Sequence, residues 1–254
     1  MKVASWNVNS IRVREQQVLD WLAAEQPDVL GLQEIKMPTE DFPVDVFSKA
    51  GYHSLVDGQK TYNGVALLSR DEGIDVHCAL PNFVDEQKRA IAATYNGTRV
   101  INLYVPNGKA VGDEKYDYKL SWLEALHRWV ADEMEQHDKV VVMGDFNIAP
   151  DDRDVHDPEE WSGKILCSDA ERAALQGLLD IGLQDSFRLF DQEDRLFSWW
   201  DYRAAGFRRN RGLRIDLLLV SAAVAETCSA SSIDKEPRKL ERPSDHAPVL
   251  IEFK

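Results

Sequence analysis

The most informative residues lie near the C-terminus, where Asp245 and His246 precede an apolar run at 249–251. A histidine titrates near neutral pH and can orient or protonate a reacting phosphate, but it needs a carboxylate to fix its tautomer. Neighbouring strand residues point to opposite faces, so Asp245 is poorly placed to hold the ring of His246. Asp216 opens a second apolar run, where a buried charge needs a partner. We therefore expect Asp216 to orient His246 in a site that acts on phosphate esters.

Other apolar runs also end in residues that can do chemistry. The run 140–143 leads into Asp145 and Asn147, which are two residues apart and face the same way if the chain stays extended. Three further runs end in Asn7 and Asn9, in Gln33 and Glu34, and in Tyr104 and Asn107. One such residue after a strand is usually a turn or a cap, but this repetition is hard to explain as turn chemistry. The pattern predicts one polar site built from several strand ends.

The elements that must position these residues are short strands and a few longer helices. Strands are predicted over Val3–Val8, Asp28–Gln33, Gly64–Ser69, Ala90–Tyr95, Arg99–Val105, Lys139–Gly144, Ile215–Ser221 and Pro248–Phe253. Helices are predicted over Arg14–Glu25, Lys115–Gln136 and Asp169–Ile181, with Trp122 and Trp129 as packing residues of the second. Many strands with few intervening helices predict an α/β fold of two packed β-sheets flanked by helices.

Composition favours a single domain over residues 1–254. No stretch resembles a linker, no internal repeat is present, and 44% of the residues are hydrophobic. The sequence has no signal-peptide segment and no apolar run that could span a bilayer, which predicts a cytoplasmic protein without membrane contact. Three widely spaced cysteines predict reduced thiols rather than a disulfide framework or a zinc site.

The charge is unevenly distributed along the chain. The 30 basic and 44 acidic residues give a net charge of −14, which argues against binding nucleic acid by bulk electrostatics. Two basic stretches stand out, Arg203, Arg208, Arg209, Arg211 and Arg214, and then Lys235, Arg238, Lys239 and Arg242. Each is either an edge that binds phosphates or a solvated loop. The acidic stretches 151–154 and 159–160 are expected to be solvated loops.

Seven motifs then carry a resemblance to a known family. They lie, in order, at 6–9, 32–36, 62–66, 143–148, 197–203, 210–216 and 243–248. With these motifs the chain resembles the exonuclease III and AP endonuclease family over nearly its whole length. The stretches 197–203 and 210–216 are similar to the exonuclease III branch in particular. The resemblance implies a four-layered α/β sandwich with a divalent-metal site at one end of its two sheets.

The metal expected at this site is Mg²⁺, with Mn²⁺ as a plausible substitute. Glu34 and Asn7 offer the hard oxygen ligands that Mg²⁺ prefers, and the resemblance implies that Glu34 is the main ligand. Further candidate ligands are Asp145, Asn147 and Asp245, the last of which could hold a second metal. The sequence leaves open whether one or two metals act.

Candidate catalytic residues follow from what phosphodiester cleavage requires. Asp145 is the best placed carboxylate to activate a water, and Asn147 can hold water or phosphate without adding charge. His246, oriented by Asp216, would stabilise charge in the transition state. The resemblance places Tyr104 near the phosphate, together with Asn107 as a substrate-binding residue. Whether Asp145, the Asp216–His246 pair or a Tyr104 phenolate activates the nucleophile is left open.

The expected substrate is double-stranded DNA with an abasic site or a 3′ end, bound by a monomer because DNA must reach the site. Trp199 is predicted to stack on an unpaired nucleotide or an abasic gap. Nearby arginines are predicted to contact backbone phosphates, namely Arg203, Arg211 and Arg214.

Three alternatives remain for the function. His156 or Trp161 could crowd the site and restrict it to trimming 3′ ends. A non-catalytic nucleic-acid-binding regulator would not need the four residues Glu34, Asp145, Asp216 and His246 together. A lipid phosphodiesterase of the same superfamily would need an apolar face for the membrane, and it would not predict the aromatic and arginine-rich stretch 197–216.

Overall fold

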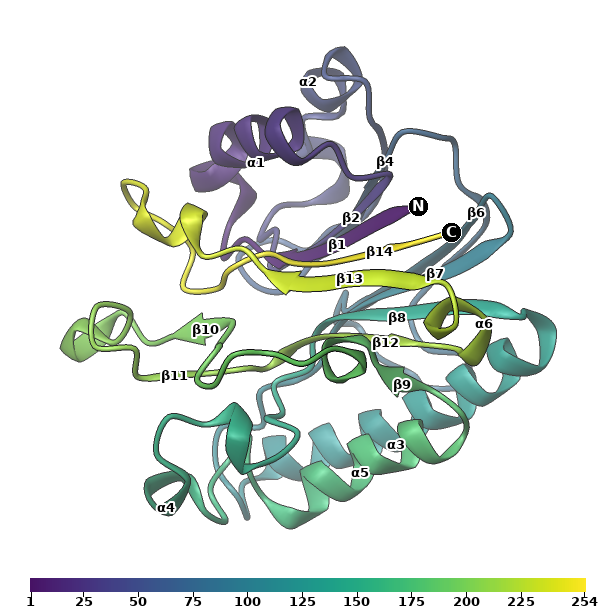
Figure 1. Ribbon diagram of the computed structural model, residues 1–254. Coiled ribbons are helices and arrows are strands. Elements are labelled where there is room, and N and C mark those ends of the chain that lie inside the picture. The colour runs from purple at the N-terminus through teal and green to yellow at the C-terminus, as the bar shows by residue number, and fades with distance from the viewer.

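The computed structural model describes residues 1–254 and contains two six-stranded sheets. The strand order in the first is β13 (Cys228–Ile233), β14 (Val249–Phe253), β1 (Lys2–Asn7), β2 (Val29–Gln33), β4 (Val65–Ser69) and β3 (His53–Asp57). In the second it is β5 (Ile74–Cys78), β6 (Ala90–Tyr95), β7 (Thr98–Tyr104), β8 (Lys139–Asp145), β12 (Asp216–Val220) and β9 (Gln184–Asp185). A separate short ribbon pairs β10 (Trp199–Trp200) with β11 (Gly212–Leu213) and projects from one edge of the sandwich (Figure 1).

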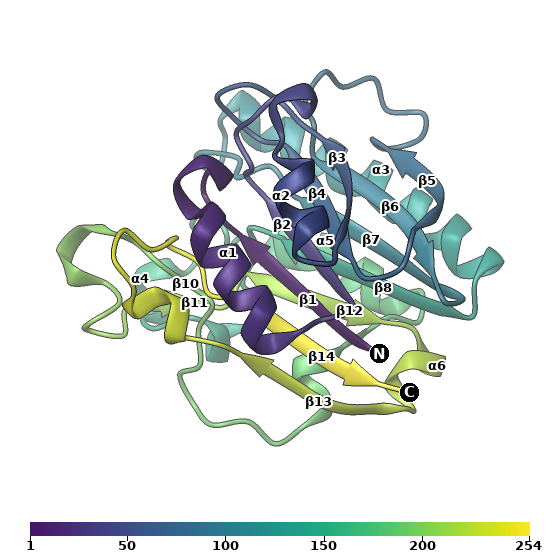
Figure 2. The same cartoon turned by 90° about the horizontal axis from the view of Figure 1, so that it is seen from above.

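Helices form the two outer layers. The main helices are α1 (Ile11–Glu25), α2 (Val44–Lys49), α3 (Glu114–Gln136) and α5 (Asp169–Asp180). Shorter pieces are α4 (Pro158–Trp161), α6 (Ala222–Ala225) and the 3₁₀ turns η1 (Thr39–Asp41), η2 (Asp152–Asp154), η3 (Ser186–Leu189), η4 (Arg203–Ala205) and η5 (Glu236–Lys239). The first sheet is covered by α1 and α2 and the second by α3 and α5 (Figures 1 and 2). None of the helices is both long and apolar enough to cross a membrane.

Three apolar clusters fill the spaces between the four layers. Val140 and Val142 of β8 belong to the cluster beneath α3 and α5, whereas Val141 and Met143 belong to the cluster between the sheets. A third cluster joins α1 and α2 to the first sheet. Successive strand residues therefore face different layers, and β8 is apolar on both faces because both are covered. The predicted α/β sandwich of two sheets flanked by helices is confirmed.

All eight predicted strands are present, as are the three predicted helices, with ends that differ by at most three residues. The strands that the sequence did not reveal include β13, β3 and β5, which lie at sheet edges. In β5 and β13 most side chains are exposed or half-buried, so neither strand has a strong apolar pattern. Trp122 and Trp129 are buried in the core as expected, and the three cysteines are free.

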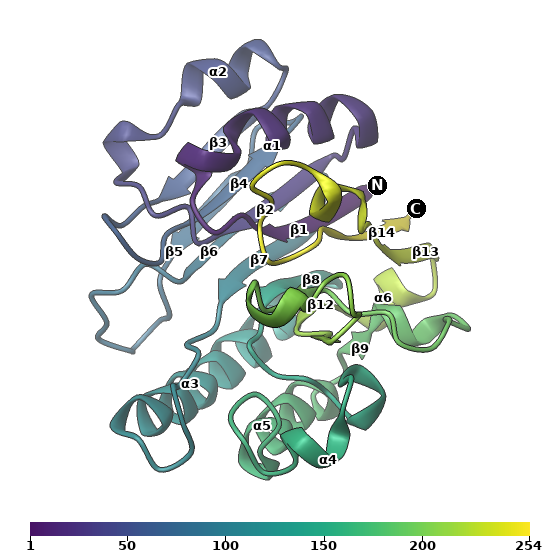
Figure 3. The same ribbon diagram turned by 90° about the vertical axis from the view of Figure 1, so that its left-hand side faces the viewer.

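The strand directions place the polar strand ends together. In the first sheet β1 runs parallel to β2 after the crossover through α1, and in the second β7 runs parallel to β8 after the crossover through α3. The carboxyl ends of all four strands lie at one edge of the sandwich, which we call the site edge (Figure 3). Ligands bind at the carboxyl ends of parallel strands in many α/β folds, since loops there bring several strands together.

A buried polar link fixes one sheet relative to the other. Asn102 of β7 donates from Nδ2 to the carbonyl oxygens of Leu32 (3.0 Å) and Ala66 (2.9 Å) in the first sheet. Gln33 donates to Asn102 Oδ1 (2.6 Å), and Gly31 leaves the space that this approach requires, because a Cβ there would lie 2.7 Å from the same oxygen. The link stands directly behind the site edge. It therefore sets how the two halves of the site face each other.

Candidate active site

Three neighbouring strands of the second sheet bring Tyr104, Asp145 and Asp216 side by side. Tyr104 pairs with Asp145 across β7 and β8, and Asp145 pairs with Asp216 across β8 and β12. Directly opposite residues in adjacent strands share a face, so the three side chains line one row. Asp145 and Asp216 are each only 1% exposed. The register alone therefore puts two buried carboxylates beside a phenol.

The backbone around Asp145 is unusual. Gly144 has a φ of 146°, and a Cβ there would lie 1.9 Å from the carbonyl oxygen of Leu103, so no other residue fits without moving β7. Asn147 has a φ of 50° in the left-handed region. The chain therefore turns after β8. The expectation that Asp145 and Asn147 face the same way required an extended chain, which the structure does not have here. Asn147 nevertheless reaches the site through this turn, and its backbone N–H donates to Asp145 Oδ1 (2.9 Å).

The first sheet contributes Glu34 and Asn7. Glu34 follows β2 and adopts a φ of 49°, a conformation that costs about 1 kcal/mol for a residue of this kind. Asn7, fully buried at the end of β1, donates from Nδ2 to Glu34 Oε1 (2.9 Å) and to Asp145 Oδ2 (2.9 Å). One amide group therefore holds two carboxylates that come from different sheets.

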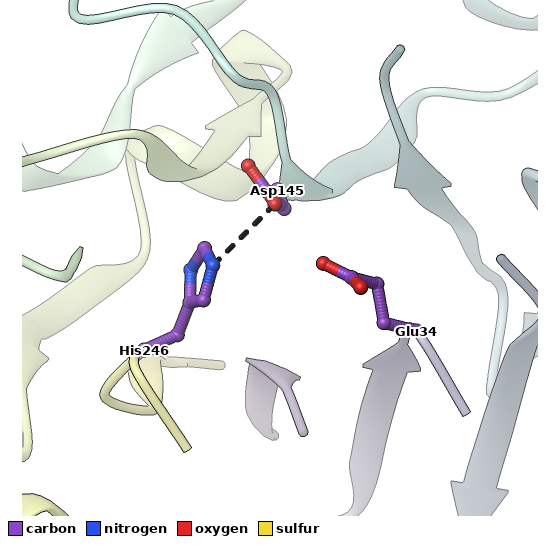
Figure 4. Close-up of side chains that lie close together, drawn as sticks. All are labelled: Glu34, Asp145 and His246. Atoms are coloured by element: carbon purple, nitrogen blue, oxygen red, sulfur yellow. Dashed lines mark ion pairs between the residues drawn. The ribbon is translucent and has the colours of Figure 1, made fainter. Parts of the chain in front are cut away.

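His246 completes the site from the segment that precedes β14. Its Nδ1 lies 2.9 Å and 3.1 Å from the two carboxylate oxygens of Asp216, and its Nε2 lies 3.7 Å from Asp145 Oδ2. Figure 4 shows His246, Asp145 and Glu34 turned toward one another, and their ligand atoms lie within 4.8 Å of each other. The predicted pairing of Asp216 with His246 is confirmed, and the glutamate and the imidazole share one site.

Burial and charge set the protonation states of this cluster. Burial raises the pKa of Asp145 to about 7, with Asp216 and Glu34 adding to the rise and His246 opposing it. Burial by itself would lower the pKa of His246, but the charges of Asp216 and Asp145 and the bond to Asp216 outweigh it and raise this pKa to about 10. The carboxylates of Asp216 and Asp145 therefore favour the imidazolium form of His246.

Tyr104 stays a neutral phenol in these surroundings. Burial raises its pKa well above the ordinary value, and the negative charges of Glu34 and Asp145 raise it further. The guanidinium of Arg89, 4.7 Å from the centre of the Tyr104 ring, opposes the rise. A phenol held in this form is a hydrogen-bond donor, so these contacts favour Tyr104 as a donor to an anion over Tyr104 as a phenolate base.

The donor set fits a hard divalent cation. Glu34 and Asp145 present carboxylate oxygens to one small space, and Mg²⁺ needs only one or two such ligands because it keeps several waters. The ammonium group of Lys36 forms an ion pair with Glu34 beside this space, with Nζ 2.9 Å from Glu34 Oε2. Asn7 turns its amide nitrogen toward the carboxylates, and its oxygen accepts from the backbone N–H of Asn9. Asn7 therefore arranges the ligands here, and the expectation that it is itself a ligand gains no support from these contacts.

The two other candidate ligands make contacts of their own. Asn147 accepts from Asn107 through Oδ1 (3.1 Å) and donates to the Val105 carbonyl (3.0 Å). Asp245 accepts from Asn9 Nδ2 (2.9 Å) and from Trp199 Nε1 (3.0 Å). Both line the same cavity as Glu34 and Asp145. Their roles as metal ligands stay predictions, as does a second metal.

Trp199 lies at the mouth of the site. Phe197 and Trp200, its aromatic neighbours in sequence, are fully buried, whereas Trp199 is half-buried and lines the cavity. Trp199 also forms a β-bridge with His246. Next to this bridge, the carbonyl oxygen of Ser198 accepts from the N–H of Ala247, and the Ser198 hydroxyl accepts from the N–H of Asp216. The ribbon strand is thus bonded to the segments that carry both members of the His–Asp pair.

The three candidate arginines lie in different environments. Arg203 is exposed and pairs with Asp201 (2.6 Å) beside the cavity, and Arg211 pairs with Glu160 (2.9 Å). Arg214 is 1% exposed, with Nε 2.6 Å from Asp154 and Nη2 2.6 Å from a second carboxylate. The prediction that Arg214 contacts substrate is therefore wrong. The side chain is enclosed in an ion-pair cluster, which also means that the stretch 151–154 is not simply solvated.

The second basic stretch also differs from the expectation of a uniformly exposed edge. Arg238 is buried, with its guanidinium near the rings of Trp200, Tyr202 and Phe207. Its Nη1 donates to the carbonyl oxygen of Ser244. Arg238 thus anchors the segment before His246 and is not free to bind a phosphate.

Two cavities meet at Tyr104 and Asn107. The first, about 390 Å³, contains Glu34, Asp145 and His246 together with Trp161, Ile165 and Trp199. The second, about 500 Å³, adjoins it through Tyr104 and Asn107. Its other lining residues are mostly polar, basic or aromatic, namely Gln59, Tyr62, Asn63, Gln87, Arg89, Pro106, Gly108, Lys109, Lys115 and Tyr118. We had not predicted Arg89 or Ile165 as site residues. Arg89 lies directly before β6, and no sequence pattern links it to Tyr104.

A buried His–Asp pair, a glutamate and an aspartate at one end of a four-layered sandwich define a metal-dependent phosphoesterase site. Residues 4–246 match the model of the endonuclease/exonuclease/phosphatase family, to which the chain belongs. It lies within the exonuclease III and AP endonuclease branch of that family and is a hydrolytic nuclease.

Particular relatives support this placement. The chain is 41% identical to exodeoxyribonuclease III of Haemophilus influenzae over the full length of both chains. Its structure matches a 3′ phosphatase from Neisseria bound to a product DNA hairpin with a TM-score of 0.99 and 50% identity, over 100% of this chain and 99% of the other. An AP endonuclease from Archaeoglobus fulgidus matches with a TM-score of 0.96 and 37% identity, over 100% and 99%.

Proposed function

We propose that the protein is a Mg²⁺-dependent DNA repair nuclease that hydrolyses phosphodiesters at abasic sites and phosphate esters at 3′ ends. The observation that carries the proposal is the convergence of Glu34, Asp145 and an Asp216-held His246 at one point. The second cavity beside Tyr104, which Arg89, Lys109 and Lys115 line, supports an anionic substrate that extends beyond the catalytic residues. Action as a monomer in the cytoplasm, with one catalytic domain over residues 1–254, belongs to the same proposal.

Each residue has a definite task in the proposed reaction. Asp145 takes the proton of the attacking water, because it is a carboxylate in the middle of the row and faces the cavity. His246 donates from Nε2 to a phosphate oxygen, while Asp216 keeps the ring oriented through Nδ1. Tyr104 donates its O–H to the same phosphate. A Mg²⁺ ion held by Glu34, with Asp145 close by, would supply Lewis-acid stabilisation of the charge on the phosphate.

The groove next to the site supports binding of a nucleic acid. Arg89, Lys109 and Lys115 provide positive charge along it, and Tyr62 and Tyr118 provide rings on which bases stack. On the opposite side of the catalytic residues, Trp199 and Arg203 line the cavity. A strand could thus be held on both sides of the reacting phosphate although the chain as a whole is acidic.

One duplex set tests the proposal directly. It carries an abasic site, a 3′-phosphate or a recessed 3′-hydroxyl, and each is incubated with Mg²⁺, with Mn²⁺ and after chelation. We expect metal-dependent release from all three and none with chelator. Binding of these duplexes without any hydrolysis would instead indicate a nucleic-acid-binding regulator, and hydrolysis of a phospholipid headgroup but not of DNA would indicate a lipid enzyme.

A narrower function is restriction to 3′ ends. Trp161 and Ile165 face the cavity together with Trp199, so three bulky side chains compete for the space that a flipped abasic sugar needs. His156 is not among them, since its Nδ1 lies 3.2 Å from the Gly212 carbonyl and its ring packs against Trp161. If the restriction holds, the abasic duplex is cut far more slowly than the 3′-phosphate is released. Trp161→Ala should then reduce the difference between these two rates.

A further inference from the structure

A fully buried ion pair lies directly beneath the site edge and has no role in the reaction just described. Lys119 of α3 and Glu171 of α5 contact each other with no exposed side-chain surface. Taking two charges out of water costs several kcal/mol per ion, and the attraction between them often fails to offset this cost. An apolar pair would pack α3 against α5 at least as well. The charges therefore need another explanation than stability.

The contacts of the amine provide that explanation. Besides Glu171, Lys119 Nζ donates to the carbonyl oxygen of Asn147 (2.7 Å) and to that of Asn107 (3.2 Å). These two residues are joined above it, where Asn107 Nδ2 donates to Asn147 Oδ1 (3.1 Å). The loop after β7 and the loop after β8 are thus tied to one buried point from below. Both carry amides that line the catalytic cavity.

Glu171 extends the same network to a third loop. Its carboxylate accepts from the N–H of Leu166 (3.1 Å) and from the N–H and hydroxyl of Ser168 (3.1 and 2.6 Å). Leu166 and its neighbour Ile165 line the cavity on the side of Trp161. The ion pair is therefore bonded to three loops that line the cavity, those after β7, after β8 and before α5.

The backbone of these loops needs such restraint. Asn147 and Leu166 have φ values of 50° and 71°, and conformations of this kind persist only where the surroundings hold them. Gly108, with a φ of 87°, lets the stem of Lys119 pass, because a Cβ there would lie 3.1 Å from the lysine Cδ. The absence of a side chain at Gly108 therefore leaves room for the Lys119 side chain where the loop after β7 turns.

From this geometry we infer that Lys119 is a positioning residue for the reaction, and that its N–H donors set the places of the Asn107 and Asn147 amides around the phosphate. Glu171 balances the charge of the amine and accepts one of its N–H bonds, but it contacts neither of the two carbonyl groups. The inference rests on the proposed function for its kinetic consequence. A displacement of about 1 Å in such groups can lower the rate about 100-fold without breaking the fold.

Four variants separate positioning from stability. Glu171→Gln removes the ion pair but leaves Lys119 with enough N–H donors for both carbonyls. Lys119→Met with Glu171→Gln also lacks the ion pair, and in addition it lacks the donors. Lys119→Met alone leaves a buried, unpaired carboxylate. Arg99→Met is the matched control, since Arg99 forms the other buried pair of α3, with Glu133 (2.8 Å), far from the site.

We expect the loss of activity to depend on whether the Lys119 N–H donors are present, and not on whether the ion pair is present. We expect kcat on a 3′-phosphate duplex to fall about 100-fold in Lys119→Met and in the double variant. In Glu171→Gln and Arg99→Met it should stay within about 3-fold of the parent, although both lower the melting temperature. The Mg²⁺ concentration for half-maximal rate should not change, because Lys119 does not touch Glu34. Equal losses in Glu171→Gln and in the double variant, or activity that follows melting temperature across all four, would overturn the inference.

A measurement without substrate keeps this test independent of the proposed function. The side-chain amide signals of Asn107 and Asn147 in NMR spectra report the two loops directly. They should shift or broaden in the double variant and stay in place in Glu171→Gln and Arg99→Met. Unchanged signals in the double variant would reject the positioning role even if the parent hydrolyses DNA. A parent that does not hydrolyse DNA would reject only the proposed function.

Discussion

The site edge and the opposite edge of the sandwich join their strands in different ways. At the opposite edge β6 and β7 are connected by Asn96 and Gly97, with φ values of 50° and 77°, which are residues that suit a tight hairpin. At the site edge Ser10, Glu34 and Leu166 also have positive φ, although none is a residue that favours it. This hairpin is therefore turned by residues that tolerate positive φ, whereas at the site edge the same conformation falls on residues that it strains.

The largest difference between the two edges is expected from a variant that changes one side chain at the site edge and leaves the backbone unchanged. Asp145→Asn keeps the shape of the side chain but removes the proposed base, so kcat should fall about 1,000-fold or more. Binding of duplex DNA, measured by fluorescence anisotropy, should remain, since the grooves are unchanged. An activity within about 10-fold of the parent would remove Asp145 from the role of base and leave the Asp216–His246 pair.

A change at the mouth of the site should have a smaller and more selective effect. Trp199→Ala removes the ring that lines the cavity, and we expect cleavage at an abasic site to fall about 10-fold, in line with one lost stacking contact. The Mg²⁺ dependence should be unaffected. Trp199→Phe is the control, because it keeps an aromatic ring while removing the Nε1 bond to Asp245, and it should retain most of the activity. Equal loss in both variants would indicate that this bond matters more than the ring.

At the opposite edge only stability should respond. Gly97→Ala places a side chain in open space but at a φ of 77°, so the strain alone should cost about 1–2 kcal/mol. For a chain of this size that lowers the melting temperature by about 2–8 °C, and kcat should stay the same. Calorimetry and the 3′-phosphate assay together test this separation. A loss of activity in the folded variant would show that the two edges are coupled.

The raised pKa of Asp145 should make the stability of the protein depend on pH. The pKa of Asp145 in the fold is raised to about 7 from an ordinary value of 3.8, so its preference for the protonated form favours folding at low pH. That contribution is lost as the pH rises from about 4 to 7, because the ionised carboxylate is disfavoured in the fold. Asp145→Asn should therefore gain melting temperature relative to the parent at pH 8 but not at pH 4, with chelator present. No difference between the two pH values would argue against the raised pKa.

The smallest effect should come from relieving one strained residue. Ser10 has a φ of 91°, which glycine adopts without cost. Ser10→Gly should raise the melting temperature by about 1 °C, since the gain is partly offset by greater freedom of the unfolded chain. Activity should not change. A lower melting temperature would mean that Ser10 contributes a contact worth more than its strain.

The sequence was most informative where a buried charge needs a partner. Asp216 could be assigned to His246 because it opens an apolar run and Asp245 points the wrong way, and the structure confirms that pairing. The eight main strands followed from their apolar runs. In contrast, Arg214 resembles the exposed arginines around it, and only its distant partners Asp154 and Asp185 reveal that it is enclosed. The left-handed turn at Asn147 had no signal beyond the residue type, because asparagine also occurs in extended segments.

The ribbon strand that carries Trp199 limits how the enzyme can acquire new preferences. Its backbone bonds to the segment of His246, and the adjacent Ser198 hydroxyl bonds to the backbone of Asp216, so the strand proposed to select substrates also braces the His–Asp pair. Insertions there would disturb chemistry together with selection. Changes in selectivity are therefore easier to make from the other wall, by exchanging single side chains such as Trp161, than by grafting a whole loop.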